Sequence, residues 1–136
     1  MTDAIYVEIN ATVATVVLNR PEKLNALDLP QWIRVGELMA ELHDEDAIRC
    51  VVVRGADEQA FSAGADIAGF EKHRNTEAQV RAYGKVIDTS LTAIKNCRHP
   101  VIAAIQGVCV GGGLELSSAC DIRICSASSR FGAPIN

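Results

Sequence analysis

The sequence predicts an α/β fold whose central strands are largely parallel. Two nearly continuous apolar runs, residues 48–55 and 101–107, are typical of strands covered on both faces. Around them, apolar residues recur every three or four positions, which indicates amphipathic helices. A chain of 136 residues suits one domain, so we expect a single domain over residues 1–136.

The first half of the chain predicts a hairpin followed by a helix. Residues 5–9 (IYVEI) alternate in polarity, and residues 13–18 (VATVVL) follow closely, so the two stretches predict an antiparallel hairpin. Asp28 is placed to cap a helix whose first turn holds Pro30 and Gln31. The apolar face expected for this helix consists of Trp32, Val35, Leu38, Met39 and Leu42.

The second half predicts a second long helix, then a short helix and a further strand. Thr76 is suited to start the long helix, and a short helix is expected after the glycines at 111–113. Residues 121–126 (DIRICS) predict the strand that follows. The apolar face expected for the long helix consists of Val80, Tyr83, Ile87, Leu91 and Ile94.

Composition excludes several classes of partner. The formal net charge of −4, with no basic cluster, gives no electrostatic reason to expect nucleic acid or an anionic membrane. No apolar run approaches the roughly 20 residues that span a bilayer, and no signal sequence is recognised. We therefore expect a cytoplasmic protein.

The five cysteines, at positions 50, 97, 109, 120 and 125, form no C-x-x-C pair. The three histidines are scattered, so no metal-ligand spacing is present and no metal site is expected. Each cysteine lies in an apolar run, which predicts reduced, buried thiols.

Two loops are expected to follow strand ends, where parallel α/β sheets place their ligands: residues 55–70 and the turn at Gly111–Gly113. Three consecutive glycines suggest that backbone must approach something closely. Their spacing matches neither a dinucleotide fingerprint, a phosphate loop nor a serine-hydrolase elbow. What remains is a helix start with free amides, which can form an oxyanion hole for a carbonyl oxygen.

Glu115 follows Gly112 by three residues and lies on the same face of the predicted short helix. A carboxylate beside a polarised carbonyl is suited to act as a general base. A second interpretation is that Glu115 only complements the helix dipole from the first turn.

Four motifs carry a resemblance to a known family. Residues 18–27 (LNRPEKLNAL), 61–67 (FSAGADI), 107–124 (GVCVGGGLELSSACDIRI) and 129–135 (SRFGAPI) resemble, in the same order, the motifs of the crotonase superfamily, the enoyl-CoA hydratases and isomerases. The resemblance implies a crotonase-like spiral of ββα units and an acyl-CoA thioester substrate. It implies no cofactor beyond the coenzyme A that forms part of the substrate.

The resemblance also implies roles for individual residues. The amides of Ala65 and Gly112 would form the oxyanion hole that stabilises an enolate, with Glu115 beside them. Lys23 would meet a CoA phosphate, although it is equally suited to be a solvated surface lysine. The remaining CoA contacts would come from Ala26 backbone, the Ala63 carbonyl, and Asp66, Ile67 and Ala68 beside the pantetheine; Asp66 is also suited to cap the short helix after it.

Two departures from the family's pattern bear on activity. Hydratases of the family typically carry a second glutamate where this sequence has Ile135, whereas isomerases commonly keep that later acid and lose the earlier one. Family chains also run to roughly twice this length and end in helices that build a trimer. The sequence therefore resembles an amino-terminal portion, truncated before those helices, of a homotrimer or a hexamer built as a dimer of trimers.

Three functions remain open from the sequence. The first is the addition of water to a 2-enoyl-CoA, which Glu115 favours. The second is another reaction through the same enolate, such as isomerisation, decarboxylation or thioester hydrolysis. The third is a non-catalytic acyl-CoA-binding or assembly module, which Ile135 and the short chain suggest.

Overall fold

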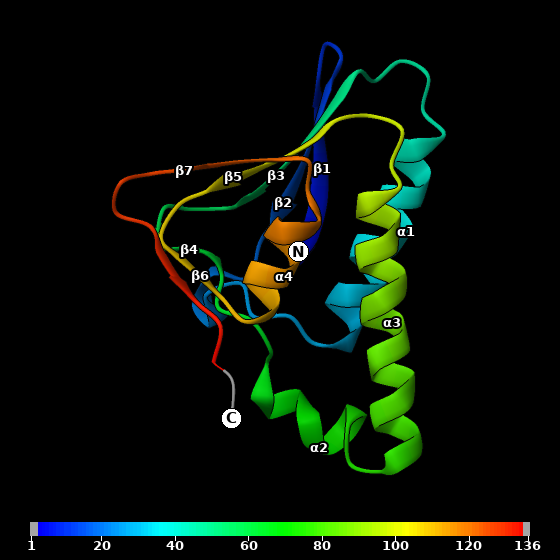
Figure 1. Ribbon diagram of the computed structural model, residues 1–136, viewed down its shortest axis with the longest axis vertical. Helices are drawn as coiled ribbons and strands as arrows, with labels where there is room; N and C mark the ends of the chain where they lie inside the picture. Colours follow the sequence, from blue (N-terminus) through cyan, green and yellow to red (C-terminus); the bar gives the residue numbers. More distant parts are fainter. Residues whose placement is uncertain (1–2, 135–136) are drawn as a thin grey trace.

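The computed structural model describes residues 3–134, and its frame is a five-stranded sheet in the order β1-β2-β3-β5-β7 (Figure 1). The strands β1 and β2 form the expected antiparallel hairpin, and each later neighbour is parallel. The parallel strands direct their carboxyl ends to the same edge, where loops can meet. The five strands are β1 Ile5–Asn10, β2 Val13–Leu18, β3 Cys50–Gly55, β5 Val101–Ile105 and β7 Ile122–Cys125.

A second, three-stranded parallel sheet was not predicted from the sequence. Its order is β4-β6-β8, and it lies below the end of the large sheet in Figure 1. Residues 55–70, expected to be a loop, contain one of these strands and the short helical segment η2 (Ile67–Gly69), and α2 (Phe70–His73) begins at the last of these residues. The three strands are β4 Ala60–Ser62, β6 Val108–Val110 and β8 Arg130–Gly132.

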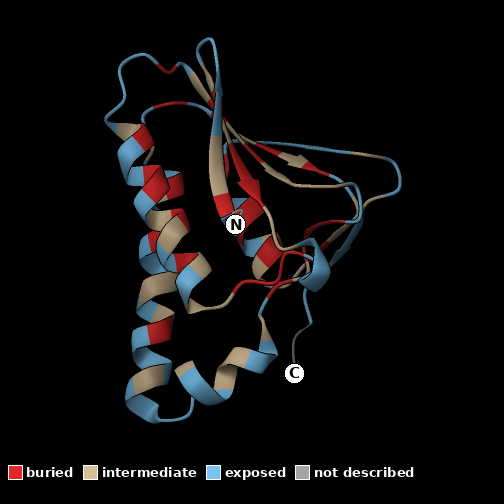
Figure 2. Cartoon of the chain, turned by 180° about the vertical axis from the view of Figure 1, so that it is seen from behind, coloured by how far each residue is buried: buried red, intermediate tan, exposed pale blue. Residues whose placement is uncertain are grey.

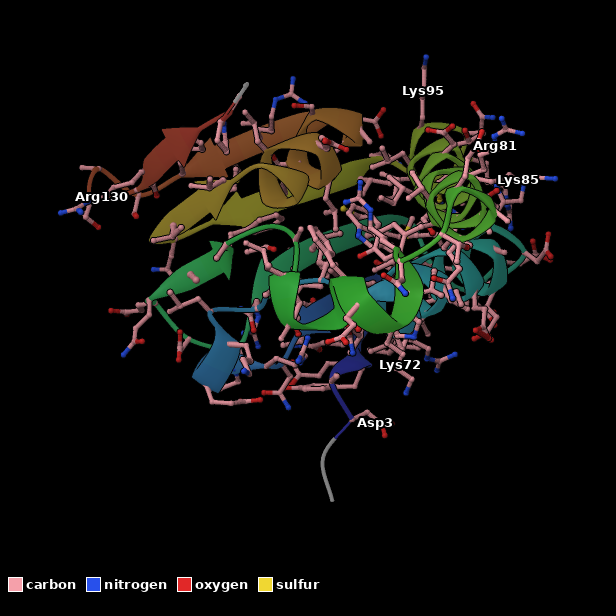
Figure 3. The ribbon with its side chains drawn as sticks, turned by 90° about the horizontal axis from the view of Figure 1, so that it is seen from below. Asp3, Lys72, Arg81, Lys85, Lys95 and Arg130 are labelled. Atoms are coloured by element: carbon pink, nitrogen blue, oxygen red, sulfur yellow. The ribbon has the colours of Figure 1, made fainter. Side chains whose placement is uncertain are left out.

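Helices α1 (Leu29–His43) and α3 (Glu77–Lys95) pack side by side beside the large sheet (Figure 1). Each begins with a capping box, Asp28 with Gln31 and Thr76 with Gln79, as their predicted starts require. The outer face of α3 projects its cations into solvent (Figure 3). The short helix expected after the glycines is α4 (Gly112–Ala119), and η1 (Pro21–Lys23) precedes α1.

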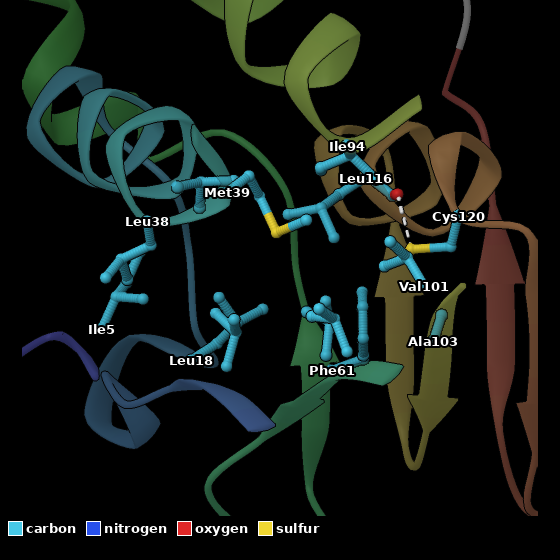
Figure 4. Close-up of a cluster of buried hydrophobic side chains, with 14 of the residues drawn as sticks. Ile5, Leu18, Leu38, Met39, Phe61, Ile94, Val101, Ala103, Leu116 and Cys120 are labelled. Atoms are coloured by element: carbon cyan, nitrogen blue, oxygen red, sulfur yellow. Dashed lines mark hydrogen bonds between the residues drawn. The ribbon is translucent and has the colours of Figure 1, made fainter. Parts of the chain in front are cut away.

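The hydrophobic core lies between these helices and one face of the large sheet (Figures 2 and 4). All five apolar residues predicted for α1 are buried. In α3, Tyr83 and Ile94 are buried and Ile87 and Leu91 are half-buried, but Val80 is 42% exposed. The prediction that Val80 belongs to the buried face of this helix is therefore wrong.

The expectation that β3 and β5 are covered on both faces is also wrong for the described residues. In β3, Val51 and Val53 are buried, whereas Val52 between them is only half-buried, and β5 alternates in the same way. All four residues of β7 are exposed. The reason is that the helices described by the structure cover a single face of the sheet.

The cysteines follow the same division between core and surface. All five are free thiols, as expected, but only Cys109 and Cys120 are buried. Cys50 and Cys97 are half-buried and Cys125 is exposed, which corrects the expectation that all five are buried. Cys125 is exposed because it ends the uncovered strand β7. Within residues 3–134, no helix is long and apolar enough to cross a membrane.

Candidate active site

The segment between β2 and α1 is fixed against β4 by a buried asparagine. The Asn25 Nδ2 donates to the Ala60 carbonyl at 2.9 Å, and the Asn25 carbonyl accepts from Ser62 Oγ at 2.8 Å. The Ala63 N–H donates to the Leu24 carbonyl at 2.9 Å. The motif at residues 18–27 therefore lies directly beside the motif at 61–67, as a shared site requires.

The Ala65 amide is oriented by a two-bond parallel bridge to Leu27. The Leu27 N–H donates to the Gly64 carbonyl at 2.7 Å, and the Asp66 N–H donates to the Leu27 carbonyl at 3.0 Å. A trans peptide unit directs its C=O and N–H to opposite sides, so the Ala65 N–H points away from Leu27. Among the described residues, no acceptor is found for it.

The Gly112 amide is oriented in the same manner by the first hydrogen bond of α4. The Glu115 N–H donates to the Gly111 carbonyl at 3.0 Å, so the N–H of the same peptide unit, that of Gly112, points out of the helix start. Gly111 itself has a φ of 56° and donates to the Gly132 carbonyl at 2.9 Å. In the part of the chain that the structure covers, the Gly112 N–H has no hydrogen-bond acceptor.

The two loops touch through glycines. A Cβ on Gly64, whose φ is +95°, would lie 3.1 Å from the Gly112 nitrogen. A Cβ on Gly113 would lie 2.3 Å from the Ser62 carbonyl oxygen, far inside van der Waals contact. The glycines thus allow the backbone after β4 and the backbone after β6 to meet, which brings the Ala65 and Gly112 segments together.

Glu115 lies in the first turn of α4 with an exposed side chain. The neighbouring residues Gly113 and Leu116 are buried, so the helix turns its apolar side to the core and this carboxylate to solvent. The ion pairs of residues 3–134 do not include Glu115. Its position is compatible with both a base and a partner of the helix dipole.

The residues expected to contact CoA are placed around the same loops. Lys23 is exposed at the end of η1, and the half-buried Ala63 follows β4. Ala26 is buried, and its carbonyl already accepts from Arg20 Nη1 at 2.8 Å. Ile67 and Ala68 are exposed in η2.

Asp66 has two structural partners, which supports its interpretation as a cap. Its Oδ1 accepts from the Ala68 N–H at 3.1 Å and caps η2, and its Oδ2 pairs with Arg20 Nη2 at 3.0 Å. The resemblance implies that residues 20–27 (RPEKLNAL) line the CoA channel, but the sequence predicts no individual role for Arg20, Asn25 or Ser62. Arg20 and Asn25 belong to the motif at residues 18–27, and Ser62 belongs to the motif at residues 61–67. Each has a hydrogen-bond partner that is distant in the sequence and is identified only from the structure.

The surroundings of the site hold neither a metal-binding cluster among the described residues nor one of the grooves described below. Residues 3–134 contain no group of three or more His, Cys, Asp or Glu that could hold a metal ion. Surface grooves of about 310 to 590 Å³ lie elsewhere, the largest of these between α1 and α3. The candidate site is instead the open junction of the two loops.

Comparison with known proteins identifies the family. The family model for enoyl-CoA hydratase/isomerase matches residues 8–136. A short-chain-enoyl-CoA hydratase from Clostridium acetobutylicum is 35% identical over 130 residues, which are 96% of this chain and 49% of the relative. A peroxisomal Delta(3,5)-Delta(2,4)-dienoyl-CoA isomerase from Arabidopsis thaliana is 35% identical over 133 residues, 90% of this chain and 47% of the relative. The chain thus spans about half the length of these relatives.

Solved structures share the fold. The structure of an enoyl-CoA hydratase/carnithine racemase from Magnetospirillum magneticum superposes on this chain with a TM-score of 0.95 and 44% sequence identity. The alignment covers 100% of this chain and 51% of the neighbour's chain. The structure of an enoyl-CoA hydratase from Bacillus anthracis superposes with a TM-score of 0.90 and 36% sequence identity, and the alignment covers 96% of this chain and 50% of the neighbour's chain. The mixed α/β fold is therefore crotonase-like, and the chain belongs to the enoyl-CoA hydratase/isomerase family within the crotonase superfamily.

Proposed function

We propose that the Ala65 and Gly112 amides bind the carbonyl oxygen of an acyl-CoA thioester. The observation that carries this proposal is that both N–H groups lack acceptors among the described residues while their loops meet at Gly64. Two such donors stabilise an oxygen that gains negative charge, and loss of one typically costs about 10²–10³ in rate. An enolate formed from a thioester places its charge on that oxygen.

We propose hydration of a 2-enoyl-CoA as the reaction. The water oxygen bonds to C3 while Glu115 takes a proton from the water, and the electron pair of the double bond moves toward the thioester oxygen. The protonated Glu115 then returns a proton to C2 as the enolate collapses, so one carboxylate serves both steps. The position of Glu115 in the first turn after Gly112 supports this role, as does the relative named a short-chain-enoyl-CoA hydratase.

The coenzyme A portion of the substrate would follow the loops around the site. Lys23 would pair with a phosphate, and the Ala63 carbonyl would accept from the adenine. Ala26, buried with its carbonyl already bonded, would contribute packing rather than a hydrogen bond. Asp66, Ile67 and Ala68 would flank the pantetheine, with Asp66 acting through its cap of η2. No separate cofactor is needed for this chemistry.

Double-bond isomerisation through the same enolate is the second candidate. It is favoured by the 35% identity to the dienoyl-CoA isomerase from Arabidopsis thaliana. It requires removal of a proton from one carbon and its return to another, without incorporation of water. Ile135, which stands where hydratases of the family carry a second acid, lies outside the described residues.

The whole protein's assembly and location are further proposals. We propose a homotrimer or a dimer of trimers, as the family resemblance implies, and a cytoplasmic location. Light scattering of the purified full-length protein measures the assembly directly, and a monomer at micromolar concentration would contradict it.

The reaction is tested by incubating the full-length protein with a panel of enoyl-CoA thioesters and identifying products by mass. Hydration adds the mass of one water, and isomerisation leaves the mass unchanged. Glu115→Gln keeps the shape but cannot accept a proton, so we expect the rate to fall about 10²–10⁴-fold with similar acyl-CoA affinity. Unchanged turnover would contradict the catalytic role of Glu115.

Two further variants sharpen this test. Glu77→Gln removes the first-turn acid of α3 together with its exposed pair to Arg81, and should leave the rate unchanged while including any helix-dipole effect on stability. Ile135→Glu supplies the family's usual second acid, which would raise hydration only if the site were built for two acids; the proposed one-carboxylate route predicts no gain. Loss in Glu115→Gln with no gain from Ile135→Glu would support the one-carboxylate route.

A further inference from the structure

We propose that Arg20 is a positioning residue that fixes the Ala65 amide through Asp66, an inference that rests on the proposed function. Its guanidinium contacts both segments that meet in the isolated bridge between Leu27 and Ala65. The Nη1 donates to the Ala26 carbonyl at 2.8 Å, and the Nη2 pairs with Asp66 Oδ2 at 3.0 Å. The same side chain therefore holds both segments whose pairing orients the Ala65 peptide.

The ion pair is largely removed from solvent. The Arg20 and Asp66 side chains are only 20% and 12% exposed. The Arg20 backbone is fixed as well, because its N–H donates to Asn25 Oδ1 at 2.8 Å and its carbonyl accepts from the Asn25 N–H at 2.9 Å. A charge-assisted pair anchored at both ends gives a defined geometry rather than a mobile surface contact.

The Ala65 N–H depends on this geometry because it has no anchor of its own. Its direction is set by the bond from the Leu27 N–H to the Gly64 carbonyl, and the next bond joins the Asp66 N–H to the Leu27 carbonyl. Loss of the guanidinium removes the side-chain link between the two segments that these bonds join, and only the segment before α1 then keeps its contacts with β4 through Asn25. A displacement of about 1 Å at a reacting centre can cost about 100-fold in rate.

Lysine cannot reproduce this arrangement. A planar guanidinium presents separate nitrogens to Ala26 and Asp66, whereas an ammonium is a single point of donation. Arg20 Nη1 also lies 3.3 Å from Gln31 Oε1, a member of the α1 capping box. The guanidinium thus connects the site loop to the rigid start of α1, and we expect Arg20→Lys to keep only part of the function.

The test compares kcat and KM for hydration of crotonyl-CoA in the full-length protein. We expect Arg20→Gln and Asp66→Asn each to lower kcat about 10- to 100-fold with KM changed less than threefold. Asparagine can still cap η2, so Asp66→Asn removes the charge while keeping the cap. The double variant should be no worse than the poorer single one, because both break one pair. Arg54→Gln, which breaks a partly exposed pair with Glu8, is the control and should leave kcat unchanged.

A spectroscopic readout separates this inference from the proposed function. We use butanoyl-CoA with a ¹³C-labelled thioester carbonyl, whose stretching band should move to lower frequency when wild-type protein binds it. Arg20→Gln should bind the probe but lose most of that shift. If that variant does not fold, Asp66→Asn carries the same test.

Two outcomes would overturn the inference, and they differ. Full carbonyl shift and full kcat in Arg20→Gln and Asp66→Asn would show that the pair only stabilises the fold, while the oxyanion hole stands. No shift in bound wild-type protein would contradict the proposed function itself, and the role of Arg20 with it.

Discussion

At the scale of single residues, the candidate site depends on the missing side chain of Gly113. A Cβ there would lie 2.3 Å from the Ser62 carbonyl oxygen, so Gly113→Ala must push α4 away from β4. We expect a loss of about 1–3 kcal/mol in the free energy of unfolding, measured with urea, because overpacking strains a buried contact. Turnover should fall as well, since Gly112 moves with the helix.

Gly84→Ala is the matched control for that change. Gly84 lies inside α3, and apart from the neighbouring backbone of the same helix no atom lies within 4 Å of the position that an alanine methyl group would take there. Alanine should therefore raise the free energy of unfolding by about 0.5–1 kcal/mol. If Gly113→Ala proved as harmless as Gly84→Ala, the close approach of the two loops would be wrong.

The same scale shows which site residues the sequence could indicate. The Gly111–Gly113 turn and Glu115 stood out because several glycines beside a carboxylate are unusual within an apolar pattern. Asn25 and Arg20 did not, because their roles depend on partners far along the chain. Asn25 bonds a carbonyl 35 positions away, and Arg20 pairs with a carboxylate 46 positions away.

At the scale of elements, the sequence predicted what local patterns determine. The hairpin and the helices α1 and α3 have periodic apolar residues and capping residues, and the structure contains all of them. The strands β4, β6 and β8 have three residues each, too few for a period to appear. They exist because they pair with one another, and that pairing is information the local sequence does not carry.

Coverage of the sheet also depends on tertiary packing. Apolar runs predicted strands in the right places for β3 and β5, but they could not show that only one face is packed by the described helices. The exposed strand β7, with Ile122 and Ile124 at 50% and 61% exposure, is where this difference is greatest.

At the scale of the whole molecule, a buried thiol and a buried phenol hydroxyl determine how the free energy of unfolding changes at alkaline pH. Burial raises the pKa of the Cys120 thiol from 9.0 to about 12, and burial together with the Asp28 carboxylate raises the pKa of Tyr83 from 10.0 to about 12. Folding therefore favours the neutral forms of both groups. Their contribution to the free energy of unfolding is complete below about pH 9 and is lost as the pH rises toward 12.

Urea unfolding between pH 8 and pH 11 measures this effect. The free energy of unfolding should fall above pH 9, by at most about 1.4 kcal/mol per pH unit for each group. Cys120→Ala should make the fall shallower, whereas Cys125→Ala, at an exposed thiol, should not. A fall that stays equally steep in Cys120→Ala would contradict the assignment of this effect to the Cys120 thiol.

The structure of the full-length protein bound to a non-reacting acyl-CoA is the most direct test of the proposed site. The two loops meet at Gly64 and leave the Ala65 and Gly112 amides without acceptors among the described residues. We predict that the thioester oxygen lies about 2.7–3.1 Å from both amide nitrogens, with Glu115 beside the acyl chain. A thioester oxygen bound away from these two amides would contradict the mechanism.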